Sequence, residues 1–319
     1  MPPRISIAVC TYNGERFLQQ QLDSLLAQTL RPDEIIVRDD VSSDATAAIV
    51  AAFATRAQAM GIHVDAQVNP ENLGYRRNFQ EAITACSGDL IFLCDQDDVW
   101  DATKLQRFAD VFQTRPELLV LHSNARLIDG EGAPLPGSLF TSLKIRRSEL
   151  RGMHDGRAFE MLLRRNLMTG AAMAFRRSLL PQVLPLPAQG WVHDAWIGIL
   201  AAAMGEVDSL EDCTIAYRLH ENNQLGVGKA RQGDRRQHRL RLLGAEQENL
   251  LALQDHLGPD APPRVLALMR SRLTHLQVRT HLPDSLLQRI GVVGSEWLSG
   301  RYGQFSRGTL SAMVDVLGR

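Results

Sequence analysis

The chain has 319 residues, a formal net charge of −1 and 45% hydrophobic residues. This is the composition of a globular protein, and it excludes a disordered or fibrous chain. At roughly 150 residues per domain, the length predicts about two domains, each with room for a core.

Apolar segments alternate with helical segments through the first hundred residues. Strands are expected over residues 5–10, 35–37, 62–68 and 90–93, and helices over residues 17–26, 44–60 and 75–86. Gly-, Pro- and Asp-rich breaks bound the short apolar runs, which favours strands over buried helices. The alternation predicts an α/β fold with a mainly parallel sheet that helices cover on both faces.

Polar groups follow three of these strands directly. They are Thr11-Tyr12-Asn13-Gly14, Arg38-Asp39-Asp40 and Asp95-Gln96-Asp97-Asp98. In open α/β sheets, ligands bind at the carboxyl ends of the strands. Carboxylates crowded at that edge repel one another, and a divalent cation removes the conflict while holding substrate phosphates. The pattern therefore predicts a metal site with a phosphorylated ligand.

The pattern loosens beyond residue 110. Strands are expected at 118–121, 170–175 and 214–219, a helix at 191–204, and an insertion or substrate loop at 129–157. From about residue 226 the composition shifts to Arg, Leu and Gln. Apolar helical stripes are expected there at Leu240, Leu243, Leu250 and Leu257, and at Val265, Met269, Leu273 and Leu276. We predict a catalytic domain over residues 1–225 and a helical region over residues 226–319.

The acidic turn at residues 95–98 fits two chemistries. A DxD pair can hold Mg²⁺ or Mn²⁺ across a nucleotide diphosphate. Alternatively, the first Asp can be a phosphotransfer nucleophile, as in haloacid-dehalogenase-like phosphatases. That family usually opens its domain with this motif and later uses a catalytic lysine. Here the motif follows the fourth strand and the chain has three lysines, Lys104, Lys144 and Lys229, so the phosphatase interpretation is weaker.

Four blocks together resemble an inverting family 2 glycosyltransferase of the GT-A fold. They are SIAVCTYNG (6–14), IIVRDDVSSDAT (35–46), NLGYRRN (72–78) and FLCDQDDVW (92–100), in matching order and spacing over roughly residues 1–225. The resemblance implies that Thr11 and Tyr12 lie at the nucleobase. It also implies that Asp40, supported by Asp39, accepts the base N–H. The remaining implied donor contacts are Arg77, Asp95 and Gln96, and the implied metal ligands are Asp97 and Asp98.

The second half resembles the family's reaction segments. Trp191–Trp196 is similar to the segment of the catalytic base, which makes Asp194 the candidate base. Residues 217–223 (YRLHENN) resemble a block of rhamnosyltransferase-like members, in which His220 would be a further metal ligand or diphosphate contact. Residues 166–176 resemble the acceptor-side block, which places Thr169 and Gly170, together with Trp196, on the acceptor side.

The predicted function is a metal-dependent inverting glycosyltransferase that uses Mg²⁺ or Mn²⁺. The donor would be dTDP-rhamnose or a UDP-sugar, and the acceptor a saccharide or lipid-linked glycan in cell-surface polysaccharide synthesis. The alternatives are a haloacid-dehalogenase-like phosphatase, a nucleotidyltransferase, and a non-catalytic protein that binds nucleotide-sugars.

Charge and cysteine content bear on location and partners. Acidic residues outnumber basic ones up to about residue 225, and basic residues dominate beyond it. The basic region suits peripheral contact with an anionic inner-membrane surface, and packing on the catalytic domain or formation of a homodimer fits equally well. We expect no nucleic-acid partner. The four cysteines form no CxxC pair, and neither a signal-peptide core nor a membrane-spanning run is seen, so we expect a cytoplasmic protein.

Overall fold

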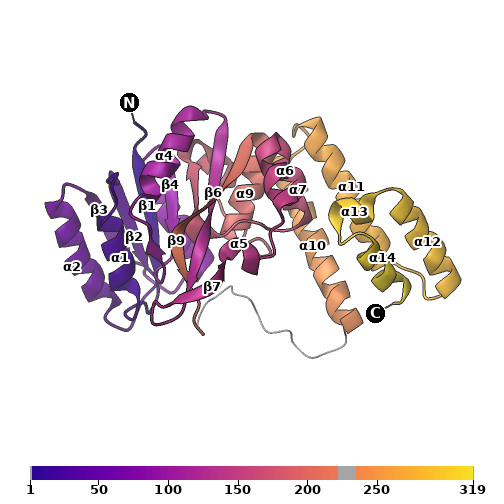
Figure 1. Cartoon of the computed structure of the whole chain (residues 1–319), viewed down its shortest axis with the longest axis horizontal. Coiled ribbons are helices and arrows are strands. Elements are labelled where there is room, and N and C mark those ends of the chain that lie inside the picture. Colours follow the sequence, from indigo (N-terminus) through magenta and orange to yellow (C-terminus); the bar gives the residue numbers. More distant parts are fainter. Residues whose placement is uncertain (1, 222–234, 319) are drawn as a thin grey trace. The chain divides into compact units, whose positions relative to one another are not determined.

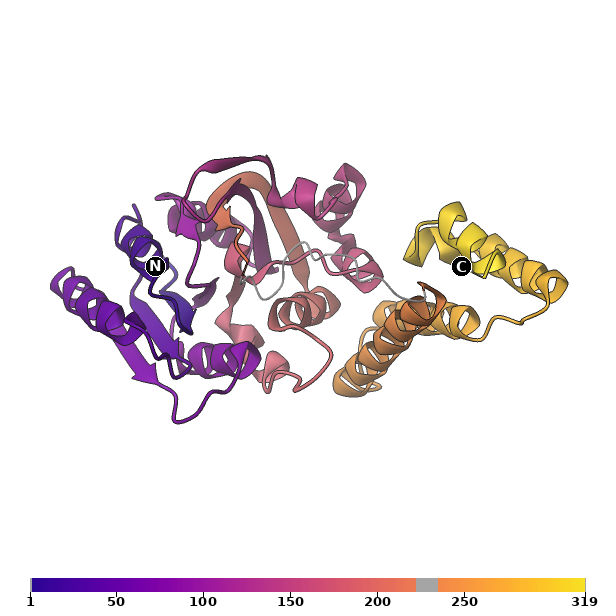
Figure 2. The same ribbon diagram turned by 90° about the horizontal axis from the view of Figure 1, so that it is seen from below.

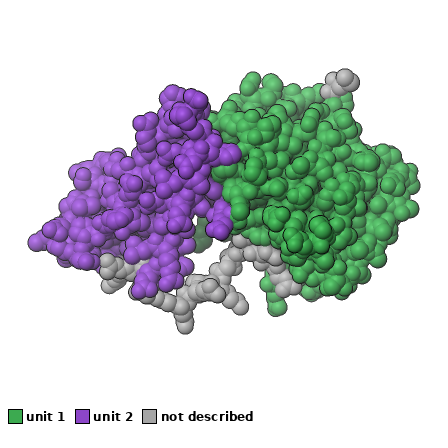
Figure 3. All heavy atoms as spheres, turned by 180° about the vertical axis from the view of Figure 1, so that it is seen from behind, with its two compact units in different colours: residues 1–158, 167–188, 192–228 green, residues 159–166, 189–191, 229–319 purple. Residues whose placement is uncertain are grey.

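The computed structural model describes residues 2–221 and 235–318. The chain divides into two compact units, coloured separately in Figure 3. Unit 1 contains residues 1–158, 167–188 and 192–228, and unit 2 contains residues 159–166, 189–191 and 229–319. The predicted boundary between residues 225 and 226 lies outside the described residues, so that division stays a prediction.

A nine-stranded sheet forms the centre of unit 1 (Figure 1). Its first part has the strand order β3-β2-β1-β4, with all three pairings parallel. Every residue of β1, β2 and β4 is buried, as expected of strands covered on both faces. These strands are β1 (Ile5–Thr11), β2 (Glu34–Asp39), β3 (His63–Val68) and β4 (Leu90–Cys94).

The second part of the sheet is mixed. β8 pairs antiparallel with both β4 and β6, whereas β6 and β9 are parallel. β5 pairs antiparallel with β9, and β7 pairs antiparallel with β6. The strands are β5 (Val99–Trp100), β6 (Leu118–Ile128), β7 (Pro134–Ser138), β8 (Met173–Arg176) and β9 (Glu206–Arg218). β6 and β9 are longer than predicted because they continue to pair with each other through polar segments.

Helices flank the sheet (Figures 1 and 2). In α1, Leu18, Leu22 and Leu25 are fully buried, and this spacing puts them on one helical face. The alternation predicted for the first hundred residues is confirmed. The helices of unit 1 are α1 (Leu18–Leu26), α2 (Thr46–Ala59), α3 (Tyr75–Ala85), α4 (Lys104–Thr114), α5 (Leu139–Ser142), α6 (Arg147–Gly152), α8 (Leu180–Val183) and α9 (His193–Met204), with short helical turns η1 (Met153–Arg157), η2 (Gly170–Ala172) and η3 (Arg177–Leu179).

Unit 2 is helical in the part that the structure describes. Most of α7 belongs to it, together with α10 to α14 (orange and yellow in Figure 2). The predicted stripes supply core residues, among them Leu243, Leu250, Met269 and Leu276. No described helix is both long and apolar enough to span a membrane. The helices are α7 (Ala158–Arg164), α10 (Arg235–Leu257), α11 (Pro263–Thr280), α12 (Leu286–Leu298), α13 (Arg301–Phe305) and α14 (Thr309–Val316).

Candidate functional site

The loop after β1 and the turn after β4 are joined by one side chain. Val9 of β1 lies opposite Cys94 of β4, so the two strands end side by side. Beyond that point, Tyr12 N donates to Gln96 Oε1 (2.8 Å), and Gln96 Nε2 donates back to Tyr12 O (3.0 Å). Tyr12 is 46% exposed, so this residue is accessible to a ligand.

Asp39 organises the loop that follows β2. Its Oδ1 accepts from Thr11 Oγ1 (2.7 Å) and from Ser42 Oγ (2.6 Å), and its Oδ2 accepts from Ser42 N (2.8 Å). Thr11 and Asp39 are both buried. These two residues, both predicted to contact the nucleotide-sugar, therefore lie together. The Asp39 carboxylate already accepts hydrogen bonds from groups of the protein itself.

Asp40 binds the loop that leads into α3. Its Oδ1 accepts from Asn69 Nδ2 (2.9 Å) and Leu73 N (2.7 Å), and its Oδ2 accepts from Gly74 N (2.8 Å). This loop sets the start of α3, whose third residue, Arg77, is exposed. The structure thus links Asp40 to the segment that carries Arg77 and leaves that side chain accessible.

The acidic turn after β4 is short of hydrogen-bond donors. Asp97 Oδ2 lies 2.8 Å from His220 Nε2, so the predicted pair of metal ligands is in contact. Asp98 Oδ1 accepts from Arg218 N (2.9 Å), and Asp98 Oδ2 is buried without a hydrogen-bond partner among the described residues. Burial, followed by the charges of Asp97 and Asp95, raises the pKa of Asp98 well above its ordinary value. Burial, Asp97 and Asp194 raise the pKa of Asp95 to about 7.

Arg218 holds the acidic turn to the end of β9. Its side chain is buried, with Nε donating to Asp97 O (2.7 Å) and Nη2 to Gln20 Oε1 (2.6 Å). Its Nη1 also donates to Asp129 O (3.1 Å), so its partners lie on three distant segments, and no local sequence pattern indicates this role. By fixing the end of β9, Arg218 brings His220 to Asp97.

Lys104 is a second functional candidate that the sequence did not indicate. It is fully buried at the start of α4, 3.6 Å from the centre of the Trp100 ring. Its Nζ donates to Ala171 O (2.8 Å). Burial lowers the pKa of Lys104 to about 7, although Cys94, Asp98 and Asp95 act in the opposite direction. Lys104 thus connects the acidic turn electrostatically with the turn at residues 170–172.

Asp194 lies in the first turn of α9 and contacts that same turn. Its Oδ2 accepts from Gly170 N (3.0 Å), and its Oδ1 accepts from Ala195 N (2.6 Å). Its side chain is buried, and burial raises its pKa to about 6 in spite of these hydrogen bonds. A carboxylate with a pKa near neutrality has the property required of a general base.

The acceptor-side candidates are only partly brought together. A Cβ on Gly170 would lie 2.8 Å from Nε2 of His193, a buried ring stacked on Phe79. Thr169 N donates to His122 Nε2 (3.2 Å) beside this turn. Trp196, in contrast, is 2% exposed and donates its indole N–H to Val183 O (3.0 Å). Trp196 therefore packs α9 against α8.

The side chains of the acidic turn and His220 offer ligand atoms that fit a divalent cation. No group of three or more His, Cys, Asp or Glu side chains is arranged for metal binding within residues 2–221 and 235–318. Mg²⁺, however, usually takes one or two carboxylates together with substrate phosphates and waters. The Asp97–His220 pair and the orphaned Asp98 oxygen match that requirement.

Comparisons with known proteins fit this geometry. Residues 6–184 match the family described as Glycosyl transferase family 2. The chain belongs to this family. The match includes the loops after β1, β2 and β4, and it ends before Asp194 and His220.

A sequence relative and two solved structures extend the comparison. An uncharacterised protein of Mycobacterium tuberculosis is 30% identical over 234 residues, which are 73% of this chain and 62% of that protein, less than two thirds of its length. S. aureus TarS 1-349 in complex with UDP-GlcNAc has a TM-score of 0.61 at 18% identity, covering 99% of this chain and 88% of that one. A mannosyltransferase of Pyrobaculum calidifontis in complex with GDP-Man and Mn²⁺ has a TM-score of 0.60 at 15% identity, covering 100% and 86%. These likenesses confirm the predicted GT-A fold.

Proposed function

We propose that this family 2 member transfers a sugar from a nucleoside-diphosphate donor, dTDP-rhamnose or a UDP-sugar, with inversion at the anomeric carbon. The acceptor would be a saccharide or lipid-linked glycan in cell-surface polysaccharide synthesis. One observation carries the proposal: Tyr12 and Gln96 bond the loop after β1 to the acidic turn after β4, beside the contact of Asp97 with His220. The two structural neighbours, which bind UDP-GlcNAc and GDP-Man, support a donor of this class.

The donor would lie along the carboxyl ends of β1, β2 and β4. Tyr12 would stack on the base, and Asp40 would accept its N–H. Asp97, Asp98 and His220 would hold Mg²⁺ or Mn²⁺, which when bound would offset the negative charge on the departing nucleoside diphosphate. The Mn²⁺ in the Pyrobaculum neighbour supports this choice of cofactor.

Asp194 would accept the proton of the acceptor hydroxyl. The acceptor oxygen forms its bond to the anomeric carbon from the face opposite the leaving group, and the bond from that carbon to the diphosphate oxygen breaks. The hydroxyl proton moves to Asp194 Oδ, and the nucleoside diphosphate departs. One displacement with one base inverts the configuration and forms no covalent enzyme intermediate.

Nucleotide release tests this function against its alternatives. The full chain is incubated with Mn²⁺ and a panel of nucleotide-sugars, and free nucleoside diphosphate is measured. Release is expected from one donor class, and Asp97→Ala should lose metal-dependent donor binding. Release of inorganic phosphate without a nucleotide would instead identify a phosphatase. Pyrophosphate from a nucleoside triphosphate would identify a nucleotidyltransferase, and donor binding without turnover a non-catalytic protein.

A cytoplasmic location, peripheral at the inner face of the plasma membrane, is part of the proposal. Nucleotide-sugars as donors and lipid-linked glycans as acceptors would meet at that face. The charge distribution supports it, because the region after residue 225 is basic.

A further inference from the structure

Lys104 is a fully buried cation that binds a backbone carbonyl group. Its Nζ donates to Ala171 O (2.8 Å) and lies 3.6 Å from the centre of the Trp100 ring. Among the described residues, Lys104 forms no ion pair with a carboxylate. Burying a cation costs free energy that a neutral side chain of similar length would not cost. Packing alone therefore does not account for a lysine at this position.

The carbonyl group that Lys104 binds belongs to the turn that contacts the candidate base. The three residues of η2 (Gly170–Ala172) are buried. Gly170 N, at the start of this turn, donates to Asp194 Oδ2 (3.0 Å), and Ala171 O, in the next residue, accepts from Lys104. Lys104 and Asp194 are thus bonded to neighbouring residues of one short turn.

The turn depends on side chains for its position, because the sheet pairing of β8 with β6 begins after it, at Met173. Thr169 N donates to His122 Nε2 (3.2 Å), and Ser123 Oγ donates to Ala172 O (3.4 Å). The bond from Lys104 is shorter than both, and a hydrogen bond from a charged donor is stronger than a neutral one. Lys104 is therefore the strongest of these three supports.

Two effects of Lys104 on the site can be separated. Its charge lowers the pKa of Asp95 and Asp98, in opposition to burial. Its hydrogen bond instead acts on the turn beside Asp194. We propose that Lys104 is a positioning residue, which holds Ala171 O and so keeps Gly170 N bonded to the carboxylate of Asp194. This rests on the proposed function and deepens it, by naming a residue on which the orientation of the base depends.

Kinetics of the full chain test this role. Lys104→Met keeps an unbranched side chain and removes the cation with its N–H donors. The readout is the release of nucleoside diphosphate, with Mn²⁺, from the nucleotide-sugar that the donor panel identifies. The value of kcat should fall by about tenfold or more, while donor affinity measured by calorimetry should stay within about threefold. An unchanged kcat would overturn the proposal. A loss of donor affinity as large as the loss of kcat would also overturn it, because Lys104 would then act on the acidic turn through its charge.

Amide hydrogen exchange tests the same step without donor, metal or turnover. Gly170 N should exchange slowly in the wild type, and Lys104→Met should speed its exchange by about tenfold or more. Lys104→Gln also removes the cation, and its side chain is one bond shorter, so it should have the same effect and replaces Lys104→Met if that variant does not fold. Unchanged exchange at Gly170 would overturn the proposal. A wild type that releases no nucleoside diphosphate would overturn the proposed function instead, and exchange would still decide whether Lys104 holds the turn.

A matched control is Arg272→Met in unit 2. Arg272 is also buried, donates to a backbone carbonyl oxygen, Phe305 O (2.7 Å), and lies over an aromatic ring, that of Phe305 (5.6 Å). Its loss should lower the stability of the protein and leave both kcat and the exchange of Gly170 N unchanged, with circular dichroism as the check on folding. An equal fall of kcat in this control would overturn the proposal, because lost stability alone would then account for the effect of Lys104→Met.

Discussion

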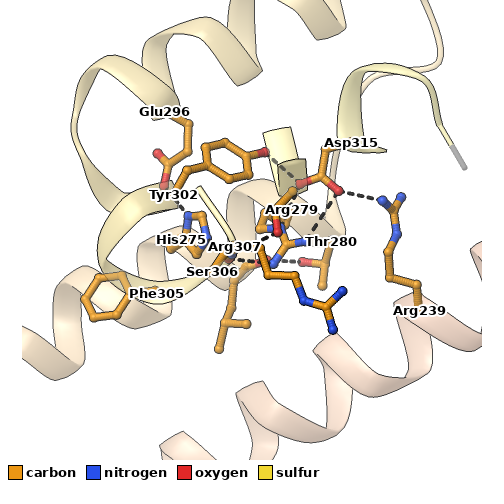
Figure 4. A network of polar contacts seen from close by, with 12 residues as sticks. Arg239, His275, Arg279, Thr280, Glu296, Tyr302, Phe305, Ser306, Arg307 and Asp315 are labelled. Atoms are coloured by element: carbon orange, nitrogen blue, oxygen red, sulfur yellow. Dashed lines mark hydrogen bonds and ion pairs between the residues drawn. The ribbon is translucent and has the colours of Figure 1, made fainter. Parts of the chain in front are cut away.

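Both units bury carboxylates, and the acidic turn of unit 1 differs from the polar network of unit 2. In unit 2, Asp315 is fully buried, and both of its carboxylate oxygens accept hydrogen bonds (Figure 4). Its Oδ1 accepts from Arg239 Nη1 (2.6 Å), and its Oδ2 accepts from Arg279 Nε (2.7 Å) and from the Tyr302 hydroxyl (2.7 Å). Burial alone would raise the pKa of Glu296, but hydrogen bonds from Arg301 and His275 bring it below its ordinary value.

In unit 1, Asp39 and Asp40 are bonded as fully, but the acidic turn after β4 is not, because Asp98 Oδ2 has no partner among the described residues. Burial and neighbouring carboxylates raise the pKa of Asp95 and Asp98, and the attraction of Lys104 does not offset them. A saturated network such as the one around Asp315 stabilises a fold. Carboxylates left short of hydrogen-bond donors are typical of a site in which a bound ligand completes their coordination. The contrast distinguishes scaffold from site within one chain.

The largest expected effect concerns the reaction itself. Asp194→Asn keeps the shape of the side chain and removes its ability to take a proton. Transfer should fall by about 10³-fold or more, while donor affinity measured by calorimetry should stay within about twofold because the acidic turn is untouched. Comparable transfer by the variant would remove Asp194 from the role of base. The amide oxygen of Asn replaces only one of the two carboxylate oxygens that accept from Gly170 N and Ala195 N. Circular dichroism and the retained donor affinity therefore serve as the folding control.

Removing a charge from each unit tests the comparison directly. Asp315→Asn leaves the buried Arg279 and the half-buried Arg239 without their carboxylate, and should cost about 3–5 kcal/mol of unfolding free energy. Asp98→Asn removes a charge that already lacks a partner on Oδ2, and should change stability by less than about 1 kcal/mol.

Denaturant unfolding in metal-free buffer measures both variants. Because the proposed donor site lies in unit 1, Asp315→Asn should retain donor binding under native conditions. A stability loss as large for Asp98→Asn as for Asp315→Asn would contradict the distinction between the two groups of acids.

Much of unit 1 could be predicted because its signals are local. The apolar runs at 5–10, 35–37 and 90–93 define parallel strands, and parallel neighbours end at one edge of a sheet. That rule alone brings the polar groups after β1, β2 and β4 together, and the contacts Thr11–Asp39 and Tyr12–Gln96 follow it.

The supporting residues could not be predicted, because their partners are distant in sequence. Lys104 bonds to Ala171 and Arg218 to Gln20, contacts that no local pattern encodes. Trp196 is predicted on the acceptor side, but it lies two residues after Asp194 on α9, about 200° further round the helix, and its side chain is buried. In unit 2, composition predicted basic helices, yet several arginines, such as Arg279, are paired inside the network.

The protonation of Asp194, in unit 1, predicts that the rate of transfer depends on pH. Its raised pKa, about 6, means that the carboxyl keeps its proton below that pH and is available as a base above it. The rate of transfer at saturating donor should therefore rise with pH to a plateau above about pH 7, and should be about tenfold lower at pH 5. Rate profiles with circular dichroism at each pH would separate this limb from unfolding. A flat rate between pH 5 and 7 would contradict the assignment.

The smallest expected effect concerns backbone strain, which differs between the two units. Among the described residues, the non-glycine residues with positive φ, Asn13, Val41 and Lys144, all lie in unit 1. Val41 is β-branched, has a φ of 64° and follows Asp40, a proposed donor-binding residue, where Ser42 is bonded to Asp39. Val41→Gly should relieve the backbone strain of the folded state. This gain should exceed the free-energy cost of the entropy that glycine adds to the unfolded chain, so the protein should be stabilised by about 1 kcal/mol. Val68→Gly, at an exposed position with ordinary strand geometry, should destabilise it by a similar amount. If Val41→Gly also destabilised the protein in denaturant unfolding, Val41 would have to contribute packing that outweighs its strain.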